Sequence, residues 1–398
     1  MTSALMSCYR QADVAFERGE GAYIYDVNAK RYLDFNAGIA VSSFGHAHPH
    51  LVKALQDQAA KLWHTSNLYR IPHQDRLAER LVANSFADKC FFVNSGVEAI
   101  ECAIKTARKY FYDQGQPDKN RIITLEGSFH GRSMAAISAA GQEKLVTGFG
   151  PLLPGFDRVR PDDLEAMAHA IGPETAAILV EPVLGEGGVL PLSDGYLQGL
   201  RALCDQHDLL LICDEIQCGM GRTGKLFAFE WAGITPDIVA AAKGIGGGFP
   251  FGACLATEKA ASGMTPGSHG TTYGGNPLAM AVGNAVLDLL LAPGFLDHVN
   301  EIGTYLKEQL DHFAAQNHNS VELVRGRGLM LGLKLRGLDP RETVATALAN
   351  GLLVAPAGDN VIRLLPPLII EKAQVDEAIG LLETTLSAMI GDRAQKAG

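Results

Sequence analysis

An acid and an amine stand at the ends of two short apolar runs in the middle of this sequence. Asp214 closes the run LLLIC of residues 209–213, and Lys243 follows the run IVAAA of residues 238–242. Each run is short, apolar and bounded by turn or helix signals, which predicts two buried strands. Ligands of open α/β sheets bind at the carboxyl ends of the strands. We therefore expect Asp214 and Lys243 to meet in one crevice.

A particular cofactor chemistry needs this pair. A lysine at a buried strand end, followed by the glycine-rich segment GIGGGFPFG of residues 244–252, can lose its proton and become a nucleophilic amine. Pyridoxal phosphate requires such a lysine for a Schiff base and an acid beside its ring nitrogen. Asp214 and Lys243 satisfy both requirements, but the two residues alone favour the simpler interpretation of a strand-end salt bridge.

The segment between them contains a false nucleotide motif. Residues 219–224, GMGRTG, match GxGxxG, and with Lys225 they nearly complete a phosphate loop. Leu226 stands where that loop needs a Ser or Thr for magnesium, and the following LFAFEWAGITPD is a poor start for a long helix. The sequence therefore disfavours nucleotide binding here.

Composition limits the partners and the location. The 398 residues are 47% hydrophobic and carry 34 Lys and Arg against 44 Asp and Glu, a net charge of −10. Without a basic cluster, nucleic acid and anionic membrane are disfavoured as partners. Seven cysteines without a CxxC pair indicate reduced thiols, and no apolar stretch reaches membrane-spanning length. We expect a soluble cytoplasmic protein.

The sequence offers two phosphate or anion contacts. The strand predicted at Cys90–Val93 leads through Ser95 and Gly96 into a helix predicted at Ile100–Tyr112, and a helix N-terminus attracts phosphate. A plain N-cap explains Ser95 equally well. The hydroxyl-rich segment GSHGTTYGGNP of residues 267–277 is a second candidate anion contact.

Charged side chains also lie on loops that follow other predicted strands. Phe129 and Arg132 flank His130 after a strand at Arg121–Leu125, and they can stack a ring and bind a carboxylate, or belong to an ordinary surface loop. Glu186 lies on a glycine loop after a strand at Ala176–Val180. Arg363 lies in the apolar VIRLLPPLII and needs a partner, for which a substrate carboxylate is one possibility.

Strands alternate with helices throughout the chain, which predicts an α/β fold. We expect a large domain at residues 51–294, a small domain at 295–398, and an N-terminal segment, residues 1–50, that packs with the small domain. That segment includes a β-hairpin over residues 21–36. His46, His48 and His50 alternate as metal ligands on a strand would, but Pro49 favours a turn and a helix start.

Together these motifs resemble those of the class III, fold-type I pyridoxal-phosphate aminotransferases across nearly the whole chain. The matching stretches, in family order and at family-like intervals, are DFNAGIAV, FGHAHP, NSGVEA, FHGR, EPVLGEGG, LLICDEIQCGMGRTG, AAAKGIGGGFPFGA, HGTTYGGNP and IRLLPPL. The resemblance implies a large domain with a mostly parallel central sheet and a smaller α+β domain. It also implies pyridoxal 5'-phosphate as cofactor.

The resemblance implies a role for each cofactor contact. Lys243 would form the Schiff base and later move the substrate proton, and Asp214 would keep the ring nitrogen protonated. Gln217 would bind the ring oxygen, and Phe129 would stack on the ring, with an aliphatic residue near Ile216 beneath it. The phosphate contacts would come from four residues: Ser95, Gly96, Val97, and Thr272 of a second subunit. The active sites would then be shared in a homodimer.

The resemblance also implies the substrates. The likeness is greatest to members that pass the terminal amine of N2-acetylornithine to 2-oxoglutarate in arginine biosynthesis. Arg132, with Thr271 of the neighbouring subunit, would bind a substrate carboxylate, and Glu186 would pair with Arg363 until glutamate arrives. Ornithine, 4-aminobutyrate, succinylornithine and N-succinyl-diaminopimelate are alternative substrates, although the small aliphatic loop NAGIAV of residues 36–41 favours the acylated one. A catalytically silent binding protein is a further alternative.

Overall fold

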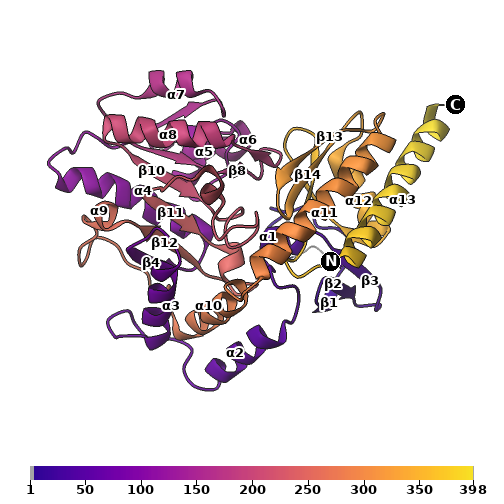
Figure 1. Ribbon diagram of the computed structural model, residues 1–398, viewed down its shortest axis with the longest axis horizontal. Coiled ribbons are helices and arrows are strands. Elements are labelled where there is room, and N and C mark those ends of the chain that lie inside the picture. The colour runs from indigo at the N-terminus through magenta and orange to yellow at the C-terminus, as the bar shows by residue number, and fades with distance from the viewer. Residues whose placement is uncertain (1–3, 398) are drawn as a thin grey trace.

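The computed structural model describes residues 4–397, which form two lobes (Figure 1). The larger lobe is built around a seven-stranded sheet with the order β4-β12-β11-β10-β7-β5-β6. Its strands are β4 (Lys89–Val93), β5 (Arg121–Leu125), β6 (Phe156–Val159), β7 (Thr175–Val180), β10 (Leu210–Asp214), β11 (Ile238–Ala241) and β12 (Gly252–Ala256). The sequence therefore placed β10 and β11 to within one residue at each end.

The sheet is parallel except at one strand. β10 runs parallel to β7 and β11, and β5 runs parallel to β6 and β7. β12 is antiparallel to both of its neighbours, β11 and β4. Because β12 follows β11 through a short loop and not through a crossover helix, the chain reverses immediately after Lys243.

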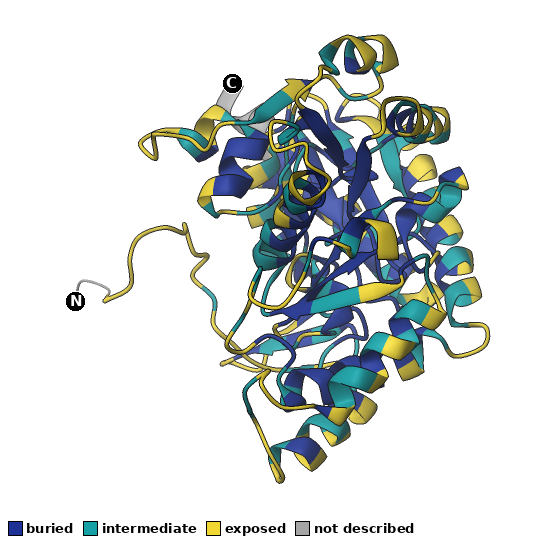
Figure 2. Cartoon of the chain, turned by 90° about the vertical axis from the view of Figure 1, so that its left-hand side faces the viewer, coloured by how far each residue is buried: buried dark blue, intermediate teal, exposed yellow. Residues whose placement is uncertain are grey.

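The strands of this sheet bury both faces, as expected when helices cover both sides. Leu211 and Cys213 of β10 belong to one apolar cluster, whereas Leu210 and Ile212 belong to another, because successive side chains point to opposite faces. Figure 2 shows the sheet as a buried layer inside more exposed helices. The helices and short strands of this lobe are α2 (Pro49–Ala59), α3 (Pro72–Ala83), α4 (Gly96–Asp113), α5 (Met134–Ala140), α6 (Glu143–Val146), α7 (Leu164–Ala170), α8 (Asp194–His207), α9 (Glu258–Ala261), α10 (Pro277–Leu290), β8 (Val183–Leu184), β9 (Leu190–Pro191) and the 3-10 helices η1 (Ala228–Ala232) and η2 (Lys243–Ile245).

The smaller lobe combines both ends of the chain. One four-stranded sheet has the order β13-β14-β17-β16, and the other has the order β1-β2-β3-β15. Leu33 and Phe35 share an apolar cluster with Leu306 and Leu382, so the N-terminal segment packs on C-terminal helices. The elements are β1 (Phe16–Glu20), β2 (Tyr23–Asp26), β3 (Arg31–Asp34), α1 (Ala37–Ala40), α11 (Phe295–Gln316), β13 (Val321–Arg327), β14 (Met330–Leu335), α12 (Pro340–Ala349), β15 (Leu352–Leu353), β16 (Ala355–Ala357), β17 (Val361–Leu364) and α13 (Lys372–Ala397). This packing supports domain boundaries near residues 50 and 294, which we retain as a proposal.

Some helix boundaries differ from those expected from the sequence. α4 begins at Gly96 and not at Ile100, because the Ser95 hydroxyl accepts the N–H of Glu98 and caps the helix. α2 begins at Pro49 and ends at Ala59. His48 is the N-cap of α2, in agreement with the helix start expected there.

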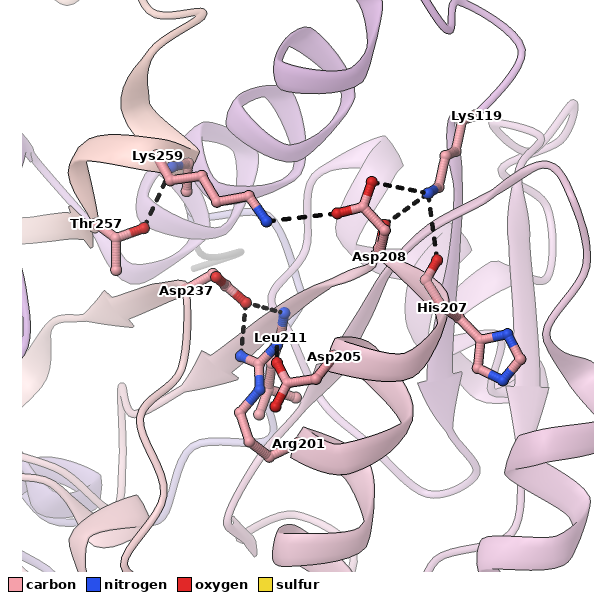
Figure 3. A network of polar contacts seen from close by, with 10 residues as sticks. Lys119, Arg201, Asp205, His207, Asp208, Leu211, Asp237, Thr257 and Lys259 are labelled. Carbon is pink, nitrogen blue, oxygen red and sulfur yellow. Dashed lines mark hydrogen bonds and ion pairs between the residues drawn. The ribbon is translucent and has the colours of Figure 1, made fainter. Parts of the chain in front are cut away.

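Charged side chains pair with one another at the amino ends of β10 and β11, at the other end of these strands from Asp214 and Lys243 (Figure 3). Arg201 of α8 binds Asp237, which precedes β11, at 2.7 Å and Asp205 at 2.8 Å. Asp208 contacts Lys259 at 3.4 Å. These groups pair with one another, so the network fixes the beginnings of β10 and β11.

Among residues 4–397, no single helix is both long and apolar enough to cross a membrane. Helices α10 and α11 pass that test of length and composition only when taken together, and they are bent by 70° relative to each other.

Candidate active site

The ends of four parallel strands surround a cavity of about 390 Å³. Asp214 ends β10, Lys243 follows β11, Glu181 follows β7, and the N-terminus of α4 follows β4. The lining side chains and backbone come from Val41, Asn94, Ser95, Gly96, Val97, Phe129, His130, Gly131, Glu181, Glu186, Asp214, Ile216, Gln217, Ala242, Lys243, Gly248, Phe249, Pro250 and Phe251. The crevice expected from Asp214 and Lys243 is therefore present, at the expected edge of the sheet.

Lys243 is held as an amine that loses its proton easily. Burial, and after it the nearby Arg363 guanidinium, lower the pKa of its ammonium group to about 8, against the opposing effect of Asp214 and Glu186. The residue also has a φ of 49°, in the left-handed region that non-glycine residues seldom adopt. Such strain is typical of residues whose position matters to a site.

Asp214 is buried and oriented by two contacts. Its Oδ1 accepts the N–H of Ile216 at 3.1 Å, and its Oδ2 lies 2.8 Å from Nδ1 of His130. Burial alone would lower the pKa of His130, but the hydrogen bond and the negative charge of Asp214 raise it above its ordinary value. This imidazole is a functional group to which sequence reasoning gave no role.

Glu181 is a second buried acid that the sequence did not identify. Its Oε1 accepts the N–H of Phe129 at 2.7 Å, and its Oε2 accepts the N–H of Gly185 at 3.1 Å. Burial raises the pKa of Glu181 to about 7, and the charge of Asp214 contributes, against the opposing effect of His130. Its position after β7, followed by Pro182, was the available signal. Glu181 ties the loop of Phe129 to the loop of Glu186.

The N-terminus of α4 forms a cradle for an anion. Ser95, Gly96 and Val97 line the cavity, and the first N–H groups of a helix have no partner within the helix. A Cβ on Gly96 would lie 3.0 Å from the Ile216 side chain, so the glycine keeps this side of the cavity open. The Ser95 hydroxyl caps the helix, as the N-cap interpretation expects, and the phosphate contact stays a prediction.

Arg363 and Glu186 form an ion pair beside the cavity, which Glu186 lines. Arg363 is only 2% exposed, and its Nη2 lies 2.6 Å from Oε1 of Glu186. Its Nη1 donates to Oε1 of Gln217 at 3.2 Å. Arg363 comes from β17 of the smaller lobe, whereas both partners belong to the larger lobe, so the pair joins the two lobes at the site.

The remaining expected residues lie around the mouth or away from this cavity. The Phe129 ring lines the cavity, and the exposed Arg132 lies with its guanidinium carbon 5.7 Å from the ring centroid. Thr271 and Thr272 line a different surface hollow. The Thr271 hydroxyl accepts from Asn94, and Thr272 is exposed. Within one chain the threonines therefore do not join the Lys243 cavity.

Two further polar side chains have local partners. Glu215 turns away from the cavity, where it accepts the N–H groups of Ala228 and Phe229, each at 2.8 Å. His46 contacts Asp34 at 2.8 Å. Within the described part of the chain, no group of three His, Cys, Asp or Glu side chains is placed to hold a metal ion.

Comparison with protein families identifies the group to which this site belongs. The family model described as Aminotransferase class-III matches residues 7–386. The chain belongs to the class III aminotransferases. An acetylornithine aminotransferase of Mesorhizobium japonicum is 60% identical over 378 residues, which are 95% of this chain and 94% of that protein. Another, from Agrobacterium fabrum, is 54% identical and covers 98% of both chains.

Solved structures agree with the family and fold class expected from the motifs. The N-acetylornithine aminotransferase of Stenotrophomonas maltophilia is 40% identical, with a TM-score of 0.85 over 97% of this chain and 99% of that one. The ornithine aminotransferase of Toxoplasma gondii is 32% identical, with a TM-score of 0.94 over 98% and 94%. Because both similarities are high, the backbone alone does not distinguish the two substrates.

The residues of this class III aminotransferase site fit pyridoxal phosphate. The T. gondii enzyme is described with partial occupancy of that cofactor at its active site. Here a buried amine, a buried carboxylate and a helix N-terminus occur in one cavity, and these are the groups that an aldehyde, a ring nitrogen and a phosphate require. The His130 contact leaves Asp214 oriented as an acceptor beside the cavity.

Proposed function

We propose that this enzyme transfers the terminal amine of N2-acetylornithine to 2-oxoglutarate. The observation that carries the proposal is the ion pair between the buried Arg363 and Glu186, a residue that lines the Lys243 cavity. Such an enzyme must accept a neutral acylated tail in one half-reaction and the second carboxylate of glutamate in the other. Glu186 would neutralise Arg363 while the neutral acylated tail is bound, and would release Arg363 to bind the second carboxylate of glutamate.

Twelve residues would serve the two ligands. Pyridoxal phosphate, when bound, supplies the electron sink that withdraws charge from the substrate carbon. Lys243 and Asp214 would hold its aldehyde and ring-nitrogen ends, Gln217 and Phe129 would contact the ring, and Ser95, Gly96 and Val97 would bind the phosphate. Arg132, Glu186 and Arg363 would select the substrate, and Thr271 and Thr272 would act from a second subunit.

The buried acids and Lys243 would control the protons. With a pKa near 8, the Lys243 amine can accept and return a proton close to neutral pH. The His130 contact orients Asp214, whose carboxylate would keep a ring nitrogen protonated. Phe249 and Phe251 in the cavity lining help to exclude water from these transfers.

The cavity wall supports the acylated substrate over free ornithine. Val41, from the small aliphatic loop at residues 36–41, is the residue of that loop that lines the cavity. An apolar wall accommodates a neutral tail without leaving a polar group unpaired. The relatives from M. japonicum and A. fabrum, both named acetylornithine aminotransferase, point to the same substrate.

We also propose a homodimer with shared active sites in the cytoplasm. Thr272 and Tyr273 are exposed beside the site, and Trp63, Leu68 and Tyr69 are exposed as well, at 66%, 87% and 67%. Large apolar side chains exposed near a site are typical of a protein interface. The described cysteines form no disulfide, which supports a reducing compartment.

The substrate proposal is tested with purified protein, pyridoxal phosphate and a panel of amino donors. The cofactor absorbance should change rapidly with N2-acetylornithine and with glutamate, and more slowly with ornithine, 4-aminobutyrate and N-succinyl-diaminopimelate. A faster reaction with ornithine than with N2-acetylornithine would overturn the substrate assignment. An absence of change with every donor would overturn the proposed activity.

A further inference from the structure

The GMGRTG segment, in which the sequence disfavours a nucleotide site, forms a buried loop between the lobes. We call residues 219–224 the docking loop; all six are buried, and they follow Asp214 and Gln217 closely in the chain. The Gly224 carbonyl accepts the side-chain amide of Asn300 in α11 at 2.9 Å. A Cβ on Gly224 would lie 1.9 Å from the Oδ1 of that asparagine, so the approach requires glycine.

Arg222 lies at the centre of this contact. Its side chain is 1% exposed, and its Nη1 donates to the carbonyls of Leu329, at 3.0 Å, and Pro366. In return, its own carbonyl accepts the N–H of Leu329 at 3.0 Å. The docking loop is therefore joined to the smaller lobe by both the backbone and the side chain of one residue.

The two accepting carbonyls lie at the same end of a strand pair. β14 and β17 are antiparallel, with Gly332 opposite Arg363 and Leu331 opposite Leu364. Continuing this register places Leu329 opposite Pro366. The Arg222 guanidinium thus contacts the ends of both strands. One of its two acceptors, the Pro366 carbonyl, is three residues after Arg363 in the chain.

Burying this arginine is costly, which calls for an explanation. In the described part of the chain Arg222 has no carboxylate partner, and its Nε and Nη2 have no hydrogen-bond partner. Burial lowers the pKa of Arg222 to about 9. A well-packed apolar side chain often stabilises a protein more than a buried charge does. Stability alone therefore does not account for an arginine here.

We infer that Arg222 is a positioning residue that fixes Arg363 relative to Lys243 by joining the docking loop to the ends of β14 and β17. Glu186, Gln217 and Asp214 belong to the larger lobe, whereas Arg363 comes from the smaller one, so Arg363 depends on such a connection. Small displacements of the Arg363 guanidinium should weaken its binding of a substrate carboxylate, because bidentate contacts between arginine and carboxylate have strict geometry.

The test rests on the proposed function and compares the two half-reactions of Arg222→Met. Single-turnover absorbance changes give a rate and an apparent affinity for each donor. In the variant, the apparent second-order rate constant with glutamate should fall by about tenfold or more, whereas that with N2-acetylornithine should change by less than about threefold. Arg222→Lys, which keeps a donor, should recover part of the glutamate reaction.

Arg201→Met is a matched control, because Arg201 is a largely buried arginine in the network at the opposite sheet edge (Figure 3). It should leave the ratio of the two half-reactions unchanged. An equal loss in both half-reactions, or no loss, in Arg222→Met would overturn the positioning role. If that variant fails to fold, the same ratio in Arg222→Lys decides the question.

A second measurement needs no substrate and separates this inference from the proposed function. Amide hydrogen exchange in cofactor-free Arg222→Met should be faster than in wild type at Leu329–Leu331 and at Val361–Leu364. In Arg201→Met these amides should exchange as in wild type. Unchanged exchange at both strands in Arg222→Met would overturn the inference even if the wild-type enzyme accepted neither donor.

Discussion

Replacing Lys243 by methionine should stabilise the cofactor-free protein. Methionine has a similar length and no charge to bury. The pKa of Lys243 is about 8, against an ordinary value of 10.5. Since one pKa unit corresponds to about 1.4 kcal/mol, keeping the amine charged in the folded state costs roughly 3 kcal/mol at pH 7. Lys243→Met removes this cost.

The gain should depend on pH in a defined direction. Between pH 8 and 10.5 the unfolded chain binds the extra proton and the folded chain does not, so wild-type stability rises with pH in this interval. The advantage of Lys243→Met is therefore full below pH 8 and should fall below about 1 kcal/mol by pH 10.

Urea denaturation of the cofactor-free proteins at pH 7 and pH 10, followed by circular dichroism, measures this difference. Lys144→Met replaces an exposed lysine and should show no such pH-dependent gap. Equal stability of wild type and Lys243→Met at pH 7, or a gap that widens at pH 10, would refute the reasoning. Lys243→Met should also lose transamination, because no other amine lines the cavity among the described residues.

Three further substitutions test single contacts. Asp214→Asn should retain the cofactor but lose most turnover, since an amide does not hold a proton on the ring nitrogen; unchanged turnover would exclude that role. Glu186→Gln should leave Arg363 uncovered, so the N2-acetylornithine half-reaction should weaken by about 1–3 kcal/mol while the glutamate half-reaction is kept or improved. Single-turnover kinetics measure both, and equal losses would contradict a switch. In Glu181→Gln the side-chain amide has one oxygen, so it can accept only one of the two N–H groups of Phe129 and Gly185. The affinity for the cofactor should therefore fall about tenfold, as measured by an absorbance titration. Unchanged affinity would contradict the proposal that Glu181 anchors the two loops.

The strands that carry the site were predictable because their signals are local. The apolar runs before Asp214 and Lys243 are bounded by turn and helix residues, and β10 and β11 follow them closely. The cavity at their carboxyl ends followed from the general behaviour of α/β sheets. The pairing of Glu186 with Arg363 did not follow from the residues, and only the family resemblance implied it.

Other parts of the site depend on contacts between distant segments. The sequence did not reveal the partners of His130 and Glu181, because their contacts with Asp214 and Phe129 exist only after β5, β7 and β10 come together. The direction of β12 was also hidden, since the short apolar run GACLA suits a parallel or an antiparallel strand equally. Arg222 gave a misleading sign, because its glycine neighbours imitate a nucleotide motif.

The reversed direction of β12 has a consequence for how much variation the cavity can tolerate. The chain reverses direction between Lys243 and Gly252, and β12 then pairs with both β11 and β4. This pairing places Gly252 opposite Val93, with the Gly252 Cα close to the Ser95 backbone. The spacing between the amine and the phosphate cradle is thus set by hydrogen-bond register and not by the packing of an intervening helix. Strand register changes only in whole residues, and a shift of one residue turns every side chain of the strand to the opposite face. An insertion or deletion between Lys243 and Gly252 therefore cannot change the spacing between the amine and the phosphate cradle by a small amount.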